Sequence, residues 1–330
     1  MLPEEFKPKT KTVNFMLLDG GVGDHVGSLV AVDYVMKRYP WITPLIWVPD
    51  YFKEFAQHLL GPDAQVFNYS QMKTRYNPNY PTKTTKWDGS TSPMKMHTVD
   101  YAFLKLCDEA PDTIYKNFLQ IASVPVSIVD ECQAKYGNYV VITTGFTAEV
   151  REFPAVEINK ISQYLVSRNI TPLFLGSTTT KTGGKHEIKG VFKEEIDFSL
   201  GHNLINKTSL LQAAQIMSGA RAVIGVDNGL LHIAACTQVP IVAGFTTVEP
   251  KFRIPIRNNR AGWRYYPIDP DNTLKCKFCQ SNTNFLYGHD YRNCLIKGEN
   301  KNLCTRQMTA EKFIHYLKFI QIDRQPIIYP

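Results

Sequence analysis

Two hydrophobic patterns alternate along this chain: short continuous apolar runs, and longer segments whose apolar residues recur at helical spacing. The clearest example lies between residues 221 and 244. An apolar run over 221–226 is followed by a polar turn with glycine, an amphipathic helix over about 230–236, and a second apolar run over 239–244. This order predicts a βαβ unit, which places the polar turn at the carboxyl edge of a parallel sheet, where ligands bind in open α/β sheets.

The turn of this unit is Asp227-Asn228-Gly229, and the helix that follows it carries His232. A helix that begins here presents backbone N–H groups and the positive end of its dipole, which suits a phosphate. From the residues alone, the alternative is a structural turn in which Asp227 caps the helix and His232 is hydrogen-bonded on the helix face.

The same alternation over the rest of the chain predicts the α/β class, with a first domain over residues 1–135 and a second over 136–330. Further strands are expected over 13–18, 41–49, 64–69, 139–145, 172–177 and 203–205, and helices over 26–36, 51–60, 97–110, 112–121, 156–168, 209–218 and 309–320. Residues 71–97 show no periodicity and are rich in Thr, Pro and Lys, which is typical of a functional or a flexible loop.

The first predicted strand ends in a glycine-rich turn that contains Gly21, Gly23, Asp24 and His25. Glycines at such a turn let a ligand approach the backbone closely. The spacing is not the Gly-x-Gly-x-x-Gly of a dinucleotide-binding turn, and no acidic residue closes a second strand in the required context. Taken by itself, Asp24 could also be a helix N-cap.

These motifs together resemble those of the heptosyltransferase-type glycosyltransferases, glycosyltransferase family 9. The part that resembles the family's C-terminal nucleotide-sugar motif is Asp227-Asn228-Gly229, His232, Ala234-Ala235, Phe245-Thr246-Thr247 and Pro250. The resemblance implies the GT-B fold, in which two Rossmann-like domains face each other across a cleft. Gly23-Asp24 resembles the family's N-terminal Gly-Asp motif, whose aspartate is the catalytic base, so the resemblance assigns that role to Asp24.

The resemblance also implies a donor site in the second domain. The family has a basic residue, usually Lys, two positions before an aromatic-Pro pair, where it contacts the donor phosphates; here Arg151 precedes Phe153-Pro154. Arginine keeps the charge and adds bidentate geometry. Many members carry an acidic residue near 177–180, where this chain has Ser-Thr-Thr-Thr, which puts the donor nucleoside in doubt. The other turn residues expected beside the cleft are Gly21, Gly23, His25, Gly145, Gly176, Ser177, Thr246 and Thr247.

The implied reaction is inverting transfer of a hexosyl, heptosyl or pentosyl group from a nucleotide-diphosphate sugar to an acceptor hydroxyl, without an obligatory divalent metal. Asp24 would deprotonate the acceptor. Arg151, the amides after Asn228-Gly229 and His232 would hold the leaving diphosphate. Family precedent favours a saccharide acceptor.

Composition leaves other acceptors open. The net charge of the 330 residues is +7, and basic and aromatic residues alternate over 251–266, which also suits a phage-type DNA glycosyltransferase that modifies hydroxymethylated bases. A non-catalytic nucleotide-binding scaffold is the alternative of another class.

No run approaches the ~20 apolar residues of a membrane span, and the first residues do not resemble a secretory signal. A cytoplasmic location is expected, and if a phage encodes the chain this is the cytoplasm of the host cell. The sequence does not predict the oligomeric state.

A cysteine-rich insertion is predicted over 276–304, before the last helix. It contains Cys276, Cys279, Cys294 and Cys304, with His289 as a further ligand candidate. Four thiolates at this density in a reducing compartment suit structural, tetrahedral zinc. The alternatives are unligated thiols or two disulfides.

Overall fold

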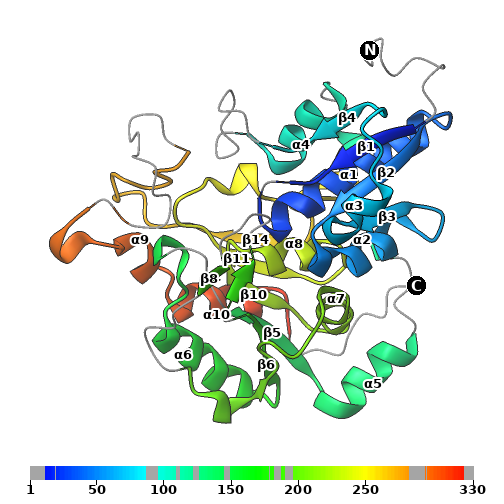
Figure 1. Cartoon of the computed structure of the whole chain (residues 1–330). Helices are drawn as coiled ribbons and strands as arrows, with labels where there is room; N and C mark the ends of the chain where they lie inside the picture. Colours follow the sequence, from blue (N-terminus) through cyan, green and yellow to red (C-terminus); the bar gives the residue numbers. More distant parts are fainter. Residues whose placement is uncertain are drawn as a thin grey trace.

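The structure is a computed structural model that describes residues 12–18, 20–86, 96–108, 112–121, 126–144, 149–177, 179–181, 187–189, 196–281, 294 and 296–322. Its two main sheets have the orders β3-β2-β1-β4 and β14-β11-β10-β5-β6-β9. Every strand pairing within these two sheets is parallel. The first sheet with its helices forms the blue and cyan part of Figure 1, and the second forms the green to red part. The predicted α/β class is confirmed.

The first sheet is built from the N-terminal part of the chain. Its elements are β1 (Thr12–Met16), α1 (Val22–Arg38), β2 (Thr43–Val48), α2 (Lys53–Leu60), β3 (Gln65–Asn68), α3 (Met72–Arg75), β4 (Thr82–Thr84) and α4 (Thr98–Cys107). The prediction of an irregular segment over 71–97 is wrong in part, because β4 pairs with β1 at the edge of the sheet. The polar Thr-Lys-Thr sequence of this edge strand gives no apolar pattern. Residues 87–95 of that segment lie outside the described residues.

The second sheet takes up most of the remaining chain. Its helices and strands are α5 (Val126–Tyr136), β5 (Tyr139–Thr144), α6 (Ala155–Val166), β6 (Thr171–Gly176), β9 (His202–Asn203), α7 (Leu210–Ser218), β10 (Val223–Val226), α8 (Gly229–Ala235), β11 (Ile241–Gly244), β14 (Tyr265–Ile268), α9 (Leu303–Arg306) and α10 (Ala310–Phe319). Two antiparallel pairs join β7 (Thr179–Lys181) to β8 (Glu187–Lys189) and β12 (Ile256–Arg257) to β13 (Arg260–Ala261). Short 3-10 helices occupy Asp50–Phe52, Tyr69–Gln71, Thr113–Lys116, Glu149–Arg151, Phe198–Leu200, Pro250–Phe252 and Gly298–Asn300.

The predicted helix over 112–121 is wrong, because only Thr113–Lys116 is helical. The next residues cross from the first half of the chain to the second. Phe118 N donates to Ile256 O at 2.8 Å, and Ile121 N donates to Cys236 O at 2.8 Å. The backbone groups that a longer helix would have paired internally are thus satisfied by the second half.

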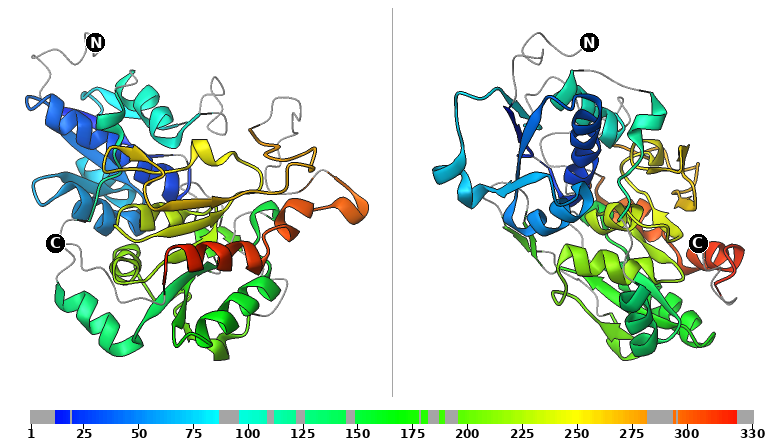
Figure 2. Two further views of the ribbon diagram at one scale, coloured as in Figure 1. Left: turned by 180° about the vertical axis from the view of Figure 1, so that it is seen from behind. Right: turned by 90° about the vertical axis from the view of Figure 1, so that its right-hand side faces the viewer.

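The two sheets share one hydrophobic core. It runs from Phe15 of β1 through Leu29 of α1 to Leu231 of α8 and Val141 of β5. Helix α1 packs on α8, and α2 packs on α7; in Figure 2 the blue helices lie directly against the yellow-green segment in both views. A second core lies beneath α6 and α10. In the part of the chain that the structure describes, no helix combines the length and apolar character needed to cross a membrane.

Candidate functional site

The turn after β10 fixes two polar side chains at the carboxyl edge of the second sheet. Asp227 N donates to Gly244 O at 3.0 Å, which anchors the turn to the neighbouring strand. Asn228 is the N-cap of α8, and its Oδ1 accepts from Leu230 N at 2.9 Å and Leu231 N at 3.3 Å. The alternative of Asp227 as the cap is therefore wrong, and its carboxylate faces other partners. Two of the amides expected to contact a phosphate are already bonded to Asn228.

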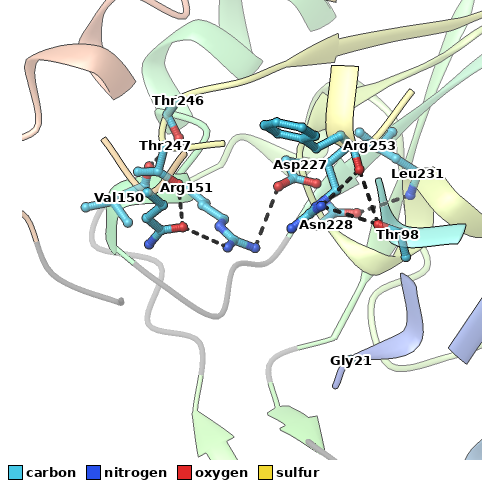
Figure 3. A network of polar contacts seen from close by, with 12 residues as sticks. Gly21, Thr98, Val150, Arg151, Asp227, Asn228, Leu231, Thr246, Thr247 and Arg253 are labelled. Carbon is cyan, nitrogen blue, oxygen red and sulfur yellow. Dashed lines mark hydrogen bonds and ion pairs between the residues drawn. The ribbon is translucent and has the colours of Figure 1, made fainter. Parts of the chain in front are cut away.

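Asp227 and Arg151 form the centre of a polar network (Figure 3). Arg151 NH1 lies 3.7 Å from Asp227 Oδ2, and both side chains are largely buried. Arg151 NH2 donates to Gln280 Oε1 at 3.3 Å, and Thr247 Oγ1 donates to the same oxygen at 3.1 Å. Thr246 is buried beside them. The sequence analysis missed Gln280, because nothing in its local pattern distinguishes it from other polar loop residues.

Asp24 lies at the N-terminus of α1, in the first half of the chain. Gly21 is the N-cap, and its N–H donates to Asp24 Oδ2 at 2.8 Å. The alternative of Asp24 as the N-cap is therefore wrong, because Asp24 is the third residue of the helix. Its carboxylate is oriented by this bond and stabilised by the positive end of the helix dipole.

His232 lies on α8 between these groups and is only 8% exposed. Its ring stacks on Phe118, with centroids 6.2 Å apart, and Nε2 lies 4.0 Å from Asp227 Oδ1. Burial lowers the pKa of His232 below its usual value, and this effect exceeds the opposing influence of the Asp227 charge. His232 is therefore neutral at pH 7, where it can act on a phosphate as a hydrogen-bond donor but not as a cation.

Two glycines allow the N-terminal turns of α1 and α8 to meet. A Cβ on Gly23 would lie 2.4 Å from His232 Cδ2, and a Cβ on Gly229 would lie 2.7 Å from Val22 Cβ. Real Cβ atoms do not approach other atoms this closely. The two glycines therefore bring Asp24 of the first half and His232 of the second half to the same site.

Comparison with known proteins supplies the family. The model of glycosyltransferase family 9 (heptosyltransferase) matches residues 68–278. The chain belongs to glycosyltransferase family 9. Lipooligosaccharide heptosyltransferase 2 of Haemophilus influenzae is 28% identical over 107 residues, which is 32% of this chain and 30% of that protein. Lipopolysaccharide heptosyltransferase 2 of Salmonella typhimurium is 24% identical over 106 residues, again 32% and 30% of the two chains. The matched region is thus under one third of the length of these curated relatives.

Solved structures of glycosyltransferases share the fold. The glycosyltransferase TibC of enterotoxigenic Escherichia coli aligns with a TM-score of 0.68 at 14% identity, over 94% of this chain and 75% of that chain. The ADP-heptose lipopolysaccharide heptosyltransferase II of E. coli aligns with a TM-score of 0.62 at 15% identity, over 94% and 98% of the two chains. The expected GT-B fold is confirmed.

The remaining family motif positions have varied environments. His25 is fully buried with its ring centroid 5.4 Å from that of Phe52, so it packs in the core rather than lining a cleft. A Cβ on Gly176 would lie 2.3 Å from Thr144 O, so this glycine permits close approach of β5 and β6. Ser177 is exposed at the end of β6. Gly145 lies outside the described residues.

The basic and aromatic segment over 251–266 is used largely inside the protein. Arg257 is fully buried and donates to four backbone carbonyls. Arg264 NH1 donates to Gln238 O at 3.0 Å, and Lys251 forms an ion pair with Glu249. The charges of Arg257, Arg264 and Lys251 thus bind neighbouring protein groups, which argues against a continuous track for DNA phosphates, while Arg260 is exposed.

The four clustered cysteines lie near one another, and all seven cysteines of the chain are free thiols, so the disulfide alternative is wrong. Burial and neighbouring thiolate charges raise the pKa of Cys279 to about 11 and that of Cys304 to about 12. Cys276 and Cys294 contribute to both shifts. Among the described residues, no three His, Cys, Asp or Glu side chains are arranged to hold a metal ion. His289 lies outside them. TibC is described as iron-containing; for this chain a structural zinc site stays a prediction.

A glycine variant tests the contact between α1 and α8. Gly23→Ala should lower the free energy of unfolding by about 1–3 kcal/mol, because the added methyl group overlaps the tightly packed His232 ring. Urea denaturation measures the change. Gly21→Ala is the matched control, since a Cβ there meets nothing within 4 Å. Equal stability of the two variants would contradict the close packing.

Proposed function

We propose that this chain is an inverting glycosyltransferase that moves a sugar from a nucleotide-diphosphate sugar to a hydroxyl of a saccharide. The observation that carries the proposal is the close packing of α1, which carries Asp24 at its N-terminus, on α8, which directly follows Asp227, the partner of Arg151. A catalytic base from one half thus lies near a cationic donor site from the other half. Family membership supports the reaction class.

The residues divide the proposed reaction as follows. Asp24 accepts the proton of the acceptor hydroxyl while that oxygen forms a bond to the anomeric carbon. The bond from the anomeric carbon to the diphosphate oxygen breaks, and its electron pair leaves with the diphosphate. Arg151 stabilises the negative charge that develops there, and neutral His232 donates a hydrogen bond to it. Attack opposite to the leaving group inverts the anomeric configuration.

We propose that residues 1–135 bind the acceptor and residues 136–330 bind the donor. Helix α5 (Val126–Tyr136) spans this boundary, and because it packs on α7 we propose that it belongs to the second domain, which moves the boundary to just before α5. A heptose is the first sugar to test, because TibC was solved in complex with ADP-D-beta-D-heptose. A saccharide acceptor is favoured over DNA, because Arg257 and Arg264 of the basic segment bind backbone carbonyls of the protein itself. A cytoplasmic location stays a proposal.

The donor site is tested by thermal shifts against a panel of nucleotide diphosphates and their sugars. One nucleotide should raise the melting temperature selectively, since a ligand at 100 times its Kd stabilises the folded state by about 2.7 kcal/mol. Arg151→Gln should remove most of this rise, because the cation that faces the diphosphate is lost. Arg168→Gln, which changes an exposed arginine after α6, should keep it. The absence of a shift with every nucleotide would refute the donor site and favour a scaffold.

A further inference from the structure

Arg253 connects the two halves of the chain next to this site. It follows the 3-10 helix Pro250–Phe252, and only 7% of its surface is exposed. Its NH1 donates to Thr98 Oγ1 at 3.3 Å and to Phe252 O at 2.9 Å. Thr98 is the first residue of α4, which packs on α1 in the first half. The guanidinium therefore reaches from the donor side to the acceptor side, as Figure 3 shows beside Asp227.

The charges around Arg253 come from both halves. Burial lowers the pKa of its guanidinium, while the carboxylates of Asp227 and Asp24 act in the opposite direction. The cation of Arg151 adds to the effect of burial. A buried cation costs several kcal/mol unless anions compensate it. The charges of Asp227 and Asp24 supply part of that compensation.

The backbone around Arg253 is fixed to the N-terminus of α4. His97 Nδ1 accepts from Val99 N at 3.2 Å, so Nε2 carries the proton and donates to Ile254 O at 2.8 Å. Burial lowers the pKa of His97, which favours this neutral form. Thr98 Oγ1 also donates to Phe252 O at 3.4 Å. Together with the bond from Arg253 NH1 to Thr98 Oγ1, the bonds of His97 to Ile254 O and of Thr98 to Phe252 O hold the Arg253 segment against the first half.

Helix α1 is held by the same threonine. A Cβ on Gly27 would lie 2.8 Å from Thr98 Cγ2, so α1 approaches α4 closely one turn after Asp24. Thr98 therefore contacts both the helix that carries Asp24 and the guanidinium of Arg253. The separation of the two carboxylates depends on this arrangement.

We infer that Arg253 is a positioning residue for sugar transfer, which holds Asp24 of the acceptor side at a fixed separation from Asp227 of the donor side. This inference rests on the proposed function. As the acceptor proton moves to Asp24, that carboxylate loses its charge, and an equal negative charge appears on the departing diphosphate. The Arg253 cation lies between the two sides throughout, so the site keeps a compensating positive charge.

The variants to compare are Arg253→Ala, Arg253→Lys and Thr98→Val, with Arg260→Met as the matched control in an exposed part of the same segment. Arg253→Ala should lower kcat by about 100-fold, in the range seen when a preorganised polar group is removed from an active site. The donor KM should change by less than about three-fold, because Arg151 remains in place. Arg253→Lys should retain more activity than Arg253→Ala, since it keeps the charge.

Added guanidinium ion at a non-denaturing concentration should restore part of kcat to Arg253→Ala and none to Arg260→Met. A role in stability alone would not give this rescue. Undiminished kcat in Arg253→Ala, or a loss of kcat that guanidinium does not restore, would overturn the inference. If Arg253→Ala does not fold, Thr98→Val decides, because it removes the hydrogen bond and keeps the cation: it should lower kcat with an unchanged donor KM, and an unaltered kcat would overturn the inference.

Failure of the proposed function can be distinguished from failure of the inference about Arg253. A wild-type chain that transfers no sugar would refute the glycosyltransferase assignment itself. The position of Arg253 can then be tested by the melting temperatures of three single variants, Arg253→Ala, Asp24→Asn and Asp227→Asn. Two double variants complete the set, each combining Arg253→Ala with one of the aspartate changes. The inference predicts that the shifts are not additive, because the three charges compensate one another. Additive shifts would overturn it.

Discussion

Asp24→Asn should reduce turnover by about 100- to 10,000-fold, the usual contribution of a general base. The amide has nearly the same shape as the carboxylate, and its oxygen can still accept the hydrogen bond from Gly21 N. It cannot take the proton of an acceptor hydroxyl. Donor affinity should change little, because the diphosphate is proposed to lie against Arg151 on the other half. Product formation and donor-induced thermal shifts measure the two quantities separately.

Asp33→Asn is the matched control, since Asp33 lies on the same helix and pairs with Lys37 at 2.8 Å. This variant should transfer sugar at the wild-type rate. Full turnover in Asp24→Asn would assign the base to another residue. Loss of donor binding along with turnover would show that Asp24 contributes to the donor site and is not a base alone.

Arg257→Met should destabilise the fold by about 3–5 kcal/mol, because several buried acceptors lose a charged donor at once. NH1 donates to Thr237 O at 2.9 Å and Val239 O at 3.0 Å, and NH2 donates to Trp263 O at 2.6 Å and Arg264 O at 3.1 Å. These carbonyls precede β11 and β14, which pair with each other. Methionine fills much of the space of the arginine stem but donates no hydrogen bond.

Urea denaturation of Arg257→Met measures the loss. Burial lowers the pKa of Arg257 to about 10, so removing the charge recovers some desolvation energy and limits the loss. Arg264→Met is the control, since its side chain is only partly buried and NH1 donates to Gln238 O at 3.0 Å. It should cost less than about 1 kcal/mol. If Arg257→Met and Arg264→Met lower the free energy of unfolding equally, the carbonyls that Arg257 contacts must find other hydrogen-bond donors.

Most of the fold could be predicted because its elements are periodic and carry local end signals. The helix predicted over 209–218 begins after Ser209, whose Oγ accepts from Gln212 N at 3.2 Å. The failures are segments whose conformation depends on distant partners. Strand β4 is polar and pairs with β1 at the edge of the sheet, and the backbone N–H groups of Phe118 and Ile121 bond to the second half. Neither relation leaves a pattern in neighbouring residues.

The residues of the candidate site also divide into those with a local sequence signal and those that depend on distant partners. Asp24, Arg151 and Asp227 each lie in a short motif at the junction of a strand and the helix that follows it, and the resemblance of these motifs to those of the family indicated them. Gln280 and Arg253 contribute through contacts with residues more than a hundred positions away, Arg151 and Thr98. A single sequence carries no record of such pairings, so it does not separate the buried Arg253 from the exposed basic residues Lys251 and Arg260 of the same segment.

The shared core beneath α1 and α8 limits how the molecule can move during a catalytic cycle. A wide hinge rotation would separate these helices and expose Leu29 and Leu231 to water, at a cost of about 25 cal/mol for each Å² of apolar surface. A small shear, in which the two helices slide along each other, keeps that surface covered. We expect substrate entry and product release to use such sliding. Gly23 and Gly229 lie where the two helices contact each other, and because they have no side chains they allow the helices to pass closely.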